Sequence, residues 1–88
     1  MHLVTGQLVR SRAGRDKTRT FAVMAVEGQM LFLADGSLRS LTKPKRKKRK
    51  HVAPIATVLT GEDLRDDQKL RQAIAAFDAQ APATLMRR

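Results

Sequence analysis

Residues 7–26 read QLVRSRAGRDKTRTFAVMAV and predict two β-strands that flank a basic loop. A first strand is expected at about Gln7 to Arg12, before the polar stretch that ends at Arg19. The second strand, Thr20 to Val26, is short and apolar on both faces, which is typical of a buried strand. Gly14, in the middle of the loop, permits a tight reversal of the chain. The pattern indicates a β fold whose first connection is strongly positive.

A second hairpin is predicted directly after these strands. Residues 29–34, QMLFLA, form another short apolar run, and Glu27-Gly28 suits the reversal that precedes it. Asp35-Gly36 then separates this run from Ser37 to Leu41. Asp-Gly between two apolar runs is a strong signal of a type I′ turn, because both central residues of that turn need positive φ. The sequence therefore predicts a fourth strand at residues 37–41.

The last predicted strand, Val52 to Leu59, is apolar again and contains a proline. Because Pro54 cannot donate a ladder hydrogen bond, this strand is expected at a sheet edge or at a bulge. Five short strands close together in a chain of 88 residues indicate a small barrel rather than an open sheet. The expected fold class is therefore mainly β, a small five-stranded barrel followed by a C-terminal helix.

The C-terminal part of the chain changes to a helical period. One apolar stripe runs along a predicted helix of about Asp66 to Gln80. Two aspartates at its start suit the positive end of the helix dipole and supply an N-cap, and Pro82 lies just past its end. A helix this short is not stable alone, so its stripe is expected to pack on the barrel or on a partner. Residues 60–63 are expected to be a loop. The stripe consists of Leu70, Ile74 and Phe77.

The charge of the chain is concentrated in one run. The sequence has 18 Lys and Arg against 8 Asp and Glu, a net charge of +10. Residues 43–50, KPKRKKRK, hold seven of these cations, and such a block repels itself and resists packing. We therefore expect residues 1–59 to form the barrel with an extended, solvated basic arm inserted at 43–50. Residues 60–88 are expected to form the loop, the helix and a frayed tail.

Two groups of cations are candidates for binding a polyanion. A charge imbalance of this size in a small protein points to such a partner, through counterion release and steering. Arg side chains bind phosphate oxygens bidentately. The number of cations in the basic run exceeds what solubility requires. The alternatives are a solvated hairpin loop and a solubilising linker. The candidates predicted from the residues themselves are Arg10, Arg12, Gly14, Arg15, Lys17, Arg19, Lys43, Lys45, Arg46, Lys47, Lys48, Arg49 and Lys50.

The aromatic content indicates how a nucleic acid would be recognised. Three Phe and no Tyr or Trp leave little for stacking on exposed bases, and all three Phe fit core positions. Recognition of single strands by aromatic platforms is therefore not expected. We expect instead that folded RNA is recognised through its phosphates and its shape.

The strand, basic loop and second strand of residues 7–26 resemble a KOW motif. The motifs AGRDK at 13–17, ADG at 34–36 and KPK at 43–45 occur in the order expected of one family. Over residues 3–80 the chain is similar to bacterial KOW-domain RNA-binding proteins related to the archaeal and eukaryotic large-subunit ribosomal protein fourteen family. The resemblance implies an SH3-like barrel, ribosomal RNA of the large subunit as the partner, and Arg39 and His51 as further RNA-binding residues.

The sequence departs from this family pattern at one position of the basic loop. Many members have a second glycine after the Asp-Lys pair, whereas this chain has Thr18. A β-branched residue resists positive φ, so the loop tip is expected to follow a different path.

Catalysis is not expected. The absence of cysteine excludes a disulfide framework and a thiolate metal site. His2 and His51 have no carboxylate pair and no second ligand at metal spacing, and the acidic residues 62–67 lack the spacing of a calcium loop. The sequence therefore predicts a protein that is not an enzyme, with no cofactor, no metal and no small-molecule substrate, and that is monomeric when free.

Two function classes stay open at this point. No apolar stretch is long enough for a transmembrane helix and the first residues lack a signal-peptide pattern, so a cytoplasmic location and no membrane partner are expected. The first hypothesis is an RNA-binding protein associated with the ribosome. The second is an SH3-like protein-interaction module, with a DNA-binding or nucleoid protein as its variant. Charge alone does not separate RNA from DNA.

Overall fold

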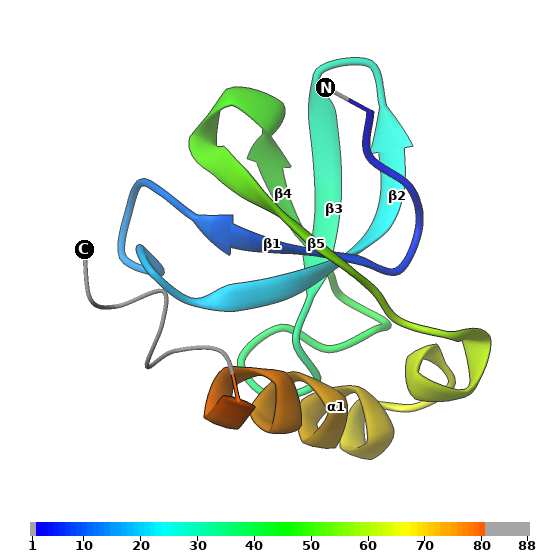
Figure 1. The fold of residues 1–88 in the computed structure, drawn as a ribbon. Helices are drawn as coiled ribbons and strands as arrows, with labels where there is room; N and C mark the ends of the chain where they lie inside the picture. Colours follow the sequence, from blue (N-terminus) through cyan, green and yellow to red (C-terminus); the bar gives the residue numbers. More distant parts are fainter. Residues whose placement is uncertain (1, 81–88) are drawn as a thin grey trace.

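The computed structural model describes residues 2–80, and its strands form one five-stranded antiparallel sheet (Figure 1). The strand order is β4-β3-β2-β1-β5, so β4 and β5 are the edge strands and no ladder joins them within residues 2–80. A single α-helix, α1, follows the sheet. The elements are β1 (Gln7–Ser11), β2 (Thr20–Glu27), β3 (Met30–Ala34), β4 (Lys45–Lys48), the 3₁₀ turn η1 (Arg49–His51), β5 (Val52–Val58), the 3₁₀ turn η2 (Gly61–Leu64) and α1 (Asp67–Gln80).

The predicted class, mainly β with a C-terminal helix, is confirmed, and so are four of the five predicted strands. The strands predicted at 7–12, 20–26, 29–34 and 52–59 correspond to β1, β2, β3 and β5 within a few residues. The reversal predicted at Gly28 joins β2 to β3, with Glu27 opposite Met30. Pro54 lies on the edge strand β5, as its missing N–H requires, and the β1–β5 register shifts between Gln7 and Val9.

The strand predicted at residues 37–41 is wrong. Asp35 does not form a two-residue hairpin turn. Instead, its Oδ1 accepts hydrogen bonds from the backbone N–H groups of Ser37 and Arg39, both at 2.9 Å. These bonds fold residues 35–44 into a loop, because the side chain satisfies amides that a ladder would otherwise use. The loop also contacts the start of the helix, where the N–H of Leu41 donates to Asp67 Oδ1 at 2.7 Å.

The prediction that the basic run, residues 43–50, forms a solvated arm is also wrong. Residues 45–48 form strand β4, which pairs with β3 so that Lys45 lies opposite Leu33 and Lys47 opposite Leu31. Residues 49–51 turn the chain into β5. The run packs because alternate side chains point to opposite faces of a strand, which lets only one lysine become buried while its neighbours remain in water. Lys47 is 8% exposed.

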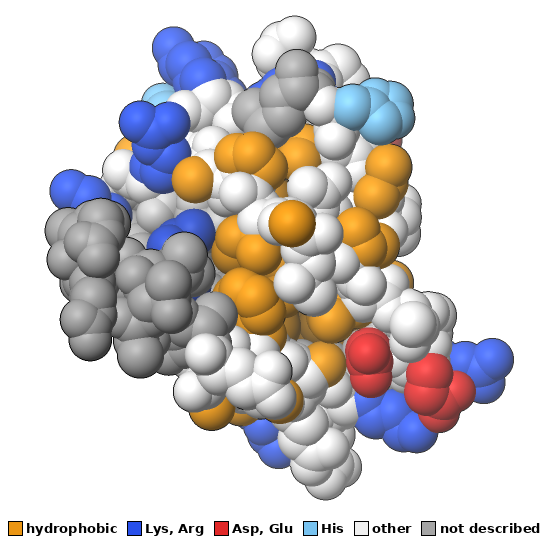
Figure 2. All heavy atoms as spheres, in the orientation of Figure 1, with side chains coloured by type: hydrophobic (Ala, Val, Ile, Leu, Met, Phe, Trp, Pro, Cys, Tyr) orange, Lys and Arg blue, Asp and Glu red, His pale blue; other side chains and the backbone are white. Residues whose placement is uncertain are grey.

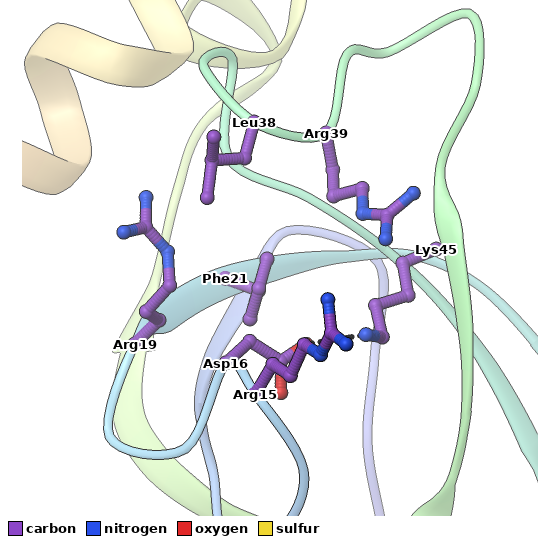
Figure 3. Close-up of a pocket in the computed structure, with 7 residues that line it drawn as sticks. All are labelled: Arg15, Asp16, Arg19, Phe21, Leu38, Arg39 and Lys45. Carbon is purple, nitrogen blue, oxygen red and sulfur yellow. Dashed lines mark ion pairs between the residues drawn. The ribbon is translucent and has the colours of Figure 1, made fainter.

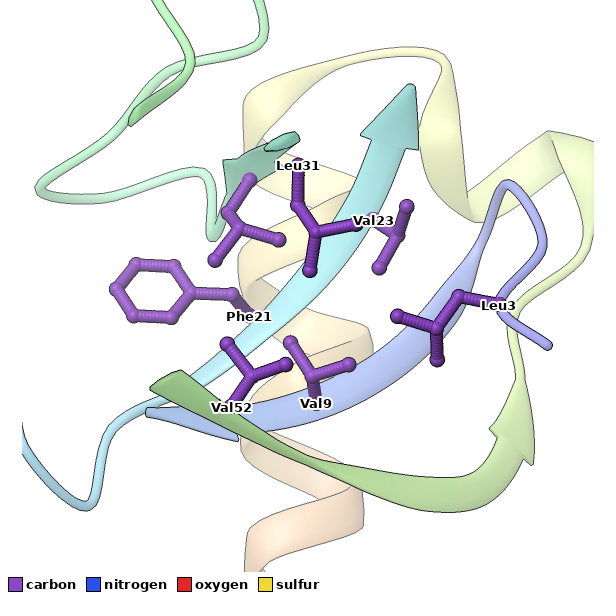
Figure 4. Close-up of a cluster of buried hydrophobic side chains, with 7 residues drawn as sticks. Leu3, Val9, Phe21, Val23, Leu31 and Val52 are labelled. Carbon is purple, nitrogen blue, oxygen red and sulfur yellow. The ribbon is translucent and has the colours of Figure 1, made fainter. Parts of the chain in front are cut away.

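The sheet buries a core on each face, which explains why its central strands are apolar on both sides. One core cluster is drawn in Figure 4, and a second lies between the sheet and the helix. Neighbouring residues alternate between them, so Val9 belongs to the first cluster and Leu8 to the second. The first cluster is Leu3, Val9, Phe21, Val23, Leu31, Leu33 and Val52; the second is Leu8, Ala22, Ala34, Leu70 and Ile74.

Helix α1 packs on the sheet, which answers the question left open by its apolar stripe. Leu70 and Ile74 are buried in the second cluster, and Phe77 is partly buried against it. The side chain of Asp66 caps the helix by accepting the N–H of Lys69 at 2.8 Å. Residues 61–64 form η2 rather than an irregular loop. Pro82 and the predicted frayed tail lie outside the described residues.

Candidate nucleic-acid interface

Asp16 joins the two basic segments of the chain. It lies in the β1–β2 loop, residues 12–19, and its carboxylate pairs with Lys45 at 2.8 Å and with Lys47 at 3.1 Å. Lys47 Nζ also donates to the carbonyl oxygen of Ala13 at 2.9 Å, and the Ser11 hydroxyl donates to Asp16 Oδ1 at 2.7 Å. These contacts hold the β1–β2 loop against β4. We call Asp16, Lys45 and Lys47 the interlock.

The interlock keeps Asp16 ionised although the residue is buried. Burial by itself raises the pKa of a carboxyl group, but the contacts from Lys45, Ser11 and Lys47 outweigh this and hold the pKa of Asp16 well below its usual range. Two ammonium groups face one carboxylate, so a positive charge remains after pairing. The interlock is therefore both a tether and a local source of positive potential.

Strand geometry directs the other cations of β4 outward. Arg46 and Lys48 alternate with the interlock lysines and are exposed, with the guanidinium of Arg46 lying 5.9 Å from the ring centroid of Phe32. In the β1–β2 loop, Arg12, Arg15 and Lys17 are exposed as well. Within residues 2–80 none of these five cations forms an ion pair, so their charge is available to a ligand.

We use the name cationic surface for the exposed cations of the β1–β2 loop and of residues 39–50 that form no ion pair with another described residue. In the view of Figure 2, several Lys and Arg side chains lie at the upper left with no Asp or Glu beside them, whereas the Asp and Glu at the lower right lie next to further Lys and Arg side chains. On this face, the cations at the upper left are therefore the ones without neighbouring acidic side chains. The members of the cationic surface are Arg12, Arg15, Lys17, Arg39, Lys43, Arg46, Lys48 and Lys50.

Several of the predicted RNA-binding residues are engaged elsewhere. Arg10 points to the helix side of β1, where it lies 3.7 Å from Asp78, and Arg19 pairs with Asp35 at 3.0 Å. Lys45 and Lys47 belong to the interlock. Arg49 is half-buried, and its backbone N–H donates to the carbonyl of Gln29 at 2.8 Å. The structure thus divides the predicted set into cations that maintain the fold and cations that face solvent.

Gly14 and Thr18 shape the loop that carries the first group of cations. Both have positive φ, +84° at Gly14 and +75° at Thr18, and Thr18 is the one non-glycine residue of the described range in this conformation. Thr18 thus adopts the left-handed conformation that a glycine favours, although its side chain is β-branched. Its N–H donates to the carbonyl of Ser11 at 2.8 Å, which holds it there.

A hollow of about 400 Å³ opens between the β1–β2 loop and the 35–44 loop (Figure 3). The cationic ends of Arg15, Arg39 and Lys45 gather on one side of it, and Leu38 lies on the other side. Leu38 is 67% exposed and is one of the few large apolar residues at the described surface. The complete lining is Arg15, Asp16, Arg19, Phe21, Leu38, Arg39 and Lys45.

A second hollow lies beside β4 and contains His51. It is lined by Met30, Arg46, Lys47, Lys48 and His51. The backbone N–H of Arg12 donates to the carbonyl of His51 at 2.8 Å, so the start of the β1–β2 loop is adjacent to His51. Lys47 lines the second hollow and Lys45 the first, so the interlock separates the two.

The local sequence did not predict Leu38 as a site residue or the structural role of Asp16. Leu38 was assigned to a strand, and nothing in its local sequence indicates that Asp35 holds it at the mouth of a hollow. A signal for the interlock was present. Positions 45 and 47 of a strand share one face, and a single acid in the first basic loop is the natural partner for lysines on that face.

Residues 2–80 contain no group of His, Asp and Glu side chains placed to hold a metal ion. In the same range, no helix has the length and apolar character needed to span a membrane. Comparison of the sequence with protein-family models and with curated proteins gives no match.

Proposed function

We propose that this chain is an RNA-binding protein of the KOW class that binds structured ribosomal RNA on the large ribosomal subunit. The observation that carries the proposal is the interlock, because it joins two basic segments about thirty residues apart into one cationic surface. A surface on which unpaired guanidinium and ammonium groups are gathered binds phosphate by counterion release. The resemblance of residues 3–80 to KOW-domain proteins supports RNA over other polyanions.

The fold is consistent with the SH3-like barrel that this class implies. Five short antiparallel strands, a β1–β5 register shift of the kind that bends a strand, and a basic loop between β1 and β2 support such a barrel. We propose that the sheet belongs to this architecture. In the proposed complex, the β1–β2 loop and the outer face of β4 contact phosphates, and they read RNA by its shape rather than by its base edges.

The proposal is tested by sedimentation of the tagged protein with ribosomal particles, with and without ribonuclease. Association with large subunits that is lost after ribonuclease supports RNA binding. A protein partner retained after nuclease treatment would instead identify a protein-interaction module. A DNA duplex with the sequence of a ribosomal RNA fragment serves as competitor. If this DNA displaced the protein from large subunits as efficiently as the RNA fragment does, the chain would be a DNA-binding protein.

A matched pair of variants assigns the binding to the cationic surface. Arg46→Gln with Lys48→Gln removes two exposed cations from β4, whereas Arg65→Gln with Arg71→Gln removes two exposed cations near the helix. Both variants lose the same formal charge. Only the first is expected to reduce association with large subunits, and equal losses would show that net charge, not this surface, determines binding.

A further inference from the structure

The hollow in Figure 3 combines features that a plain phosphate-binding surface does not need. Lys45 on its wall shares the Asp16 carboxylate with Lys47, and Arg19 is paired with Asp35. Arg15 and Arg39 have no acidic partner within residues 2–80. The hollow thus presents two available guanidinium groups, which together match one phosphate group.

The side of the hollow that carries Leu38 also carries Arg19, and Leu38 is held in place there. Leu38 lies between Ser37 and Arg39, whose backbone N–H groups both donate to Asp35 Oδ1 at 2.9 Å. The next residue toward β3, Gly36, packs so closely on the start of α1 that a Cβ would overlap the carbonyl oxygen of Asp67. An apolar side chain that is 67% exposed on an anchored loop is preorganised for contact with a ligand.

An anion site beside an exposed apolar side chain fits one nucleotide. The volume of about 400 Å³ lies within the range of ligand pockets, and the lining places the unpaired Arg15 and Arg39 together with an exposed apolar side chain, Leu38. We propose that this hollow binds a single unpaired nucleotide of the RNA, with its phosphate on Arg15 and Arg39 and its base against Leu38. The inference rests on the proposed function and adds to it that the RNA carries an extruded nucleotide, such as a bulge.

Paired nucleotides cannot enter the hollow in this way. Within a duplex the base faces its partner and is stacked on both sides, so only the phosphate is accessible to Arg15 and Arg39. A bulged nucleotide has already left the stack, and its base can cover Leu38 without the energetic cost of unpairing. The protein is therefore expected to prefer a hairpin with one bulged adenosine over the same hairpin without the bulge.

The test measures, by fluorescence anisotropy, the affinities for the bulged hairpin and for the fully paired hairpin. Three proteins are compared: the wild type, Leu38→Ser and Val58→Ser. The wild type is expected to bind the bulged hairpin about tenfold more tightly, which is the effect of burying one apolar contact. Leu38→Ser is expected to bind both hairpins with the affinity that the wild type has for the paired one. Val58→Ser is the control, since Val58 is an exposed apolar residue on β5, outside the lining of the hollow, and it should keep the full preference.

A second readout follows the bulged base directly. Dimethyl sulfate should modify the bulged adenine in free RNA and in the Leu38→Ser complex, and much less in the wild-type complex. Equal affinity of the wild type for both hairpins, or a preference retained by Leu38→Ser, would overturn the inference. So would binding of free adenosine monophosphate as tight as that of the bulged hairpin. Failure to bind either hairpin would instead contradict the proposed function itself.

Discussion

The carboxylate of Asp16 and the ammonium of Lys47 lie 3.1 Å apart, and both residues are buried. One belongs to the β1–β2 loop and the other to β4, so their contact fixes the position of one basic segment relative to the other. The order of the cationic surface therefore depends on an ion pair that does not itself belong to that surface. Fold and proposed binding are coupled at this point.

The first prediction concerns the removal of the interlock carboxylate. Asp16→Asn keeps the shape of the side chain but leaves Lys45 and Lys47 close together without a counter-charge, so we expect a loss of about 2–3 kcal/mol in the free energy of unfolding. Denaturant unfolding at neutral pH measures this loss. Asp63→Asn is the control, because the side-chain contact of Asp63 is a 3.5 Å hydrogen bond with Thr60. A similar, small effect of both substitutions would show that the interlock does not stabilise the fold.

The second prediction concerns acid pH. Because the folded-state pKa of Asp16 is lowered, its stabilising contribution is complete above the unfolded-state pKa of about 4 and is lost as the pH falls through the folded-state value. The difference in unfolding free energy between wild type and Asp16→Asn should therefore be constant near neutral pH. It should shrink as the pH is lowered below about 4. A difference that does not change with pH would contradict the assigned ionisation.

The third prediction concerns Thr18, which has a φ of +75°. Thr18→Gly removes the steric cost of the left-handed conformation, although the more flexible glycine also loses more entropy on folding. We expect a net stabilisation of a few tenths to about 1 kcal/mol in thermal or denaturant unfolding. Thr57→Gly, in the exposed part of β5 with ordinary strand φ, should destabilise instead. If Thr18→Gly destabilised the protein as much as Thr57→Gly, the loop conformation described here would be wrong.

The fourth prediction separates backbone strain from packing. Gly28 and Gly36 both have positive φ, but a Cβ at Gly28 meets nothing within 4 Å, whereas at Gly36 it would overlap the helix backbone. Gly28→Ala should cost about 1 kcal/mol of unfolding free energy from strain alone. Gly36→Ala should cost clearly more, since α1 or the 35–44 loop must also move. Denaturant midpoints that agree for the two variants would show that the loop is not packed on the helix.

The sequence allowed the central strands and the helix to be predicted because their signals are local. Apolar runs gave β2 and β3, Pro54 indicated an edge strand, and the spacing of Leu70 and Ile74 gave the face of α1 that is buried. The two largest errors in the predicted fold, the strand at residues 37–41 and the solvated arm, arose where a polar side chain overrides the local pattern. Asp35 binds backbone amides and prevents a hairpin, and Asp16 neutralises lysines distant in the chain so that a charged run can form a strand.

The candidate site was predictable in composition but not in arrangement. The cations of the loop and of the basic run are evident from the residues, and strand alternation distinguishes Arg46 from Lys47 once β4 is known. Which cations are available depends on contacts between distant segments, such as Arg10 with Asp78 and Arg19 with Asp35. Those contacts follow from the folded topology, which no local pattern specifies.

The fifth prediction tests the cationic surface most directly, through the dependence of ribosomal RNA affinity on salt concentration. Arg15, Lys17, Arg46 and Lys48 are exposed and unpaired within the described residues, so changing all four to Gln should leave the fold intact. Each phosphate contact contributes about 0.7–0.9 to the slope of log affinity against log salt, so the slope should flatten by roughly 3. Arg65→Gln with Arg71→Gln should leave the slope unchanged. Equal slopes for wild type and the four-fold variant would contradict the assignment of this surface to RNA.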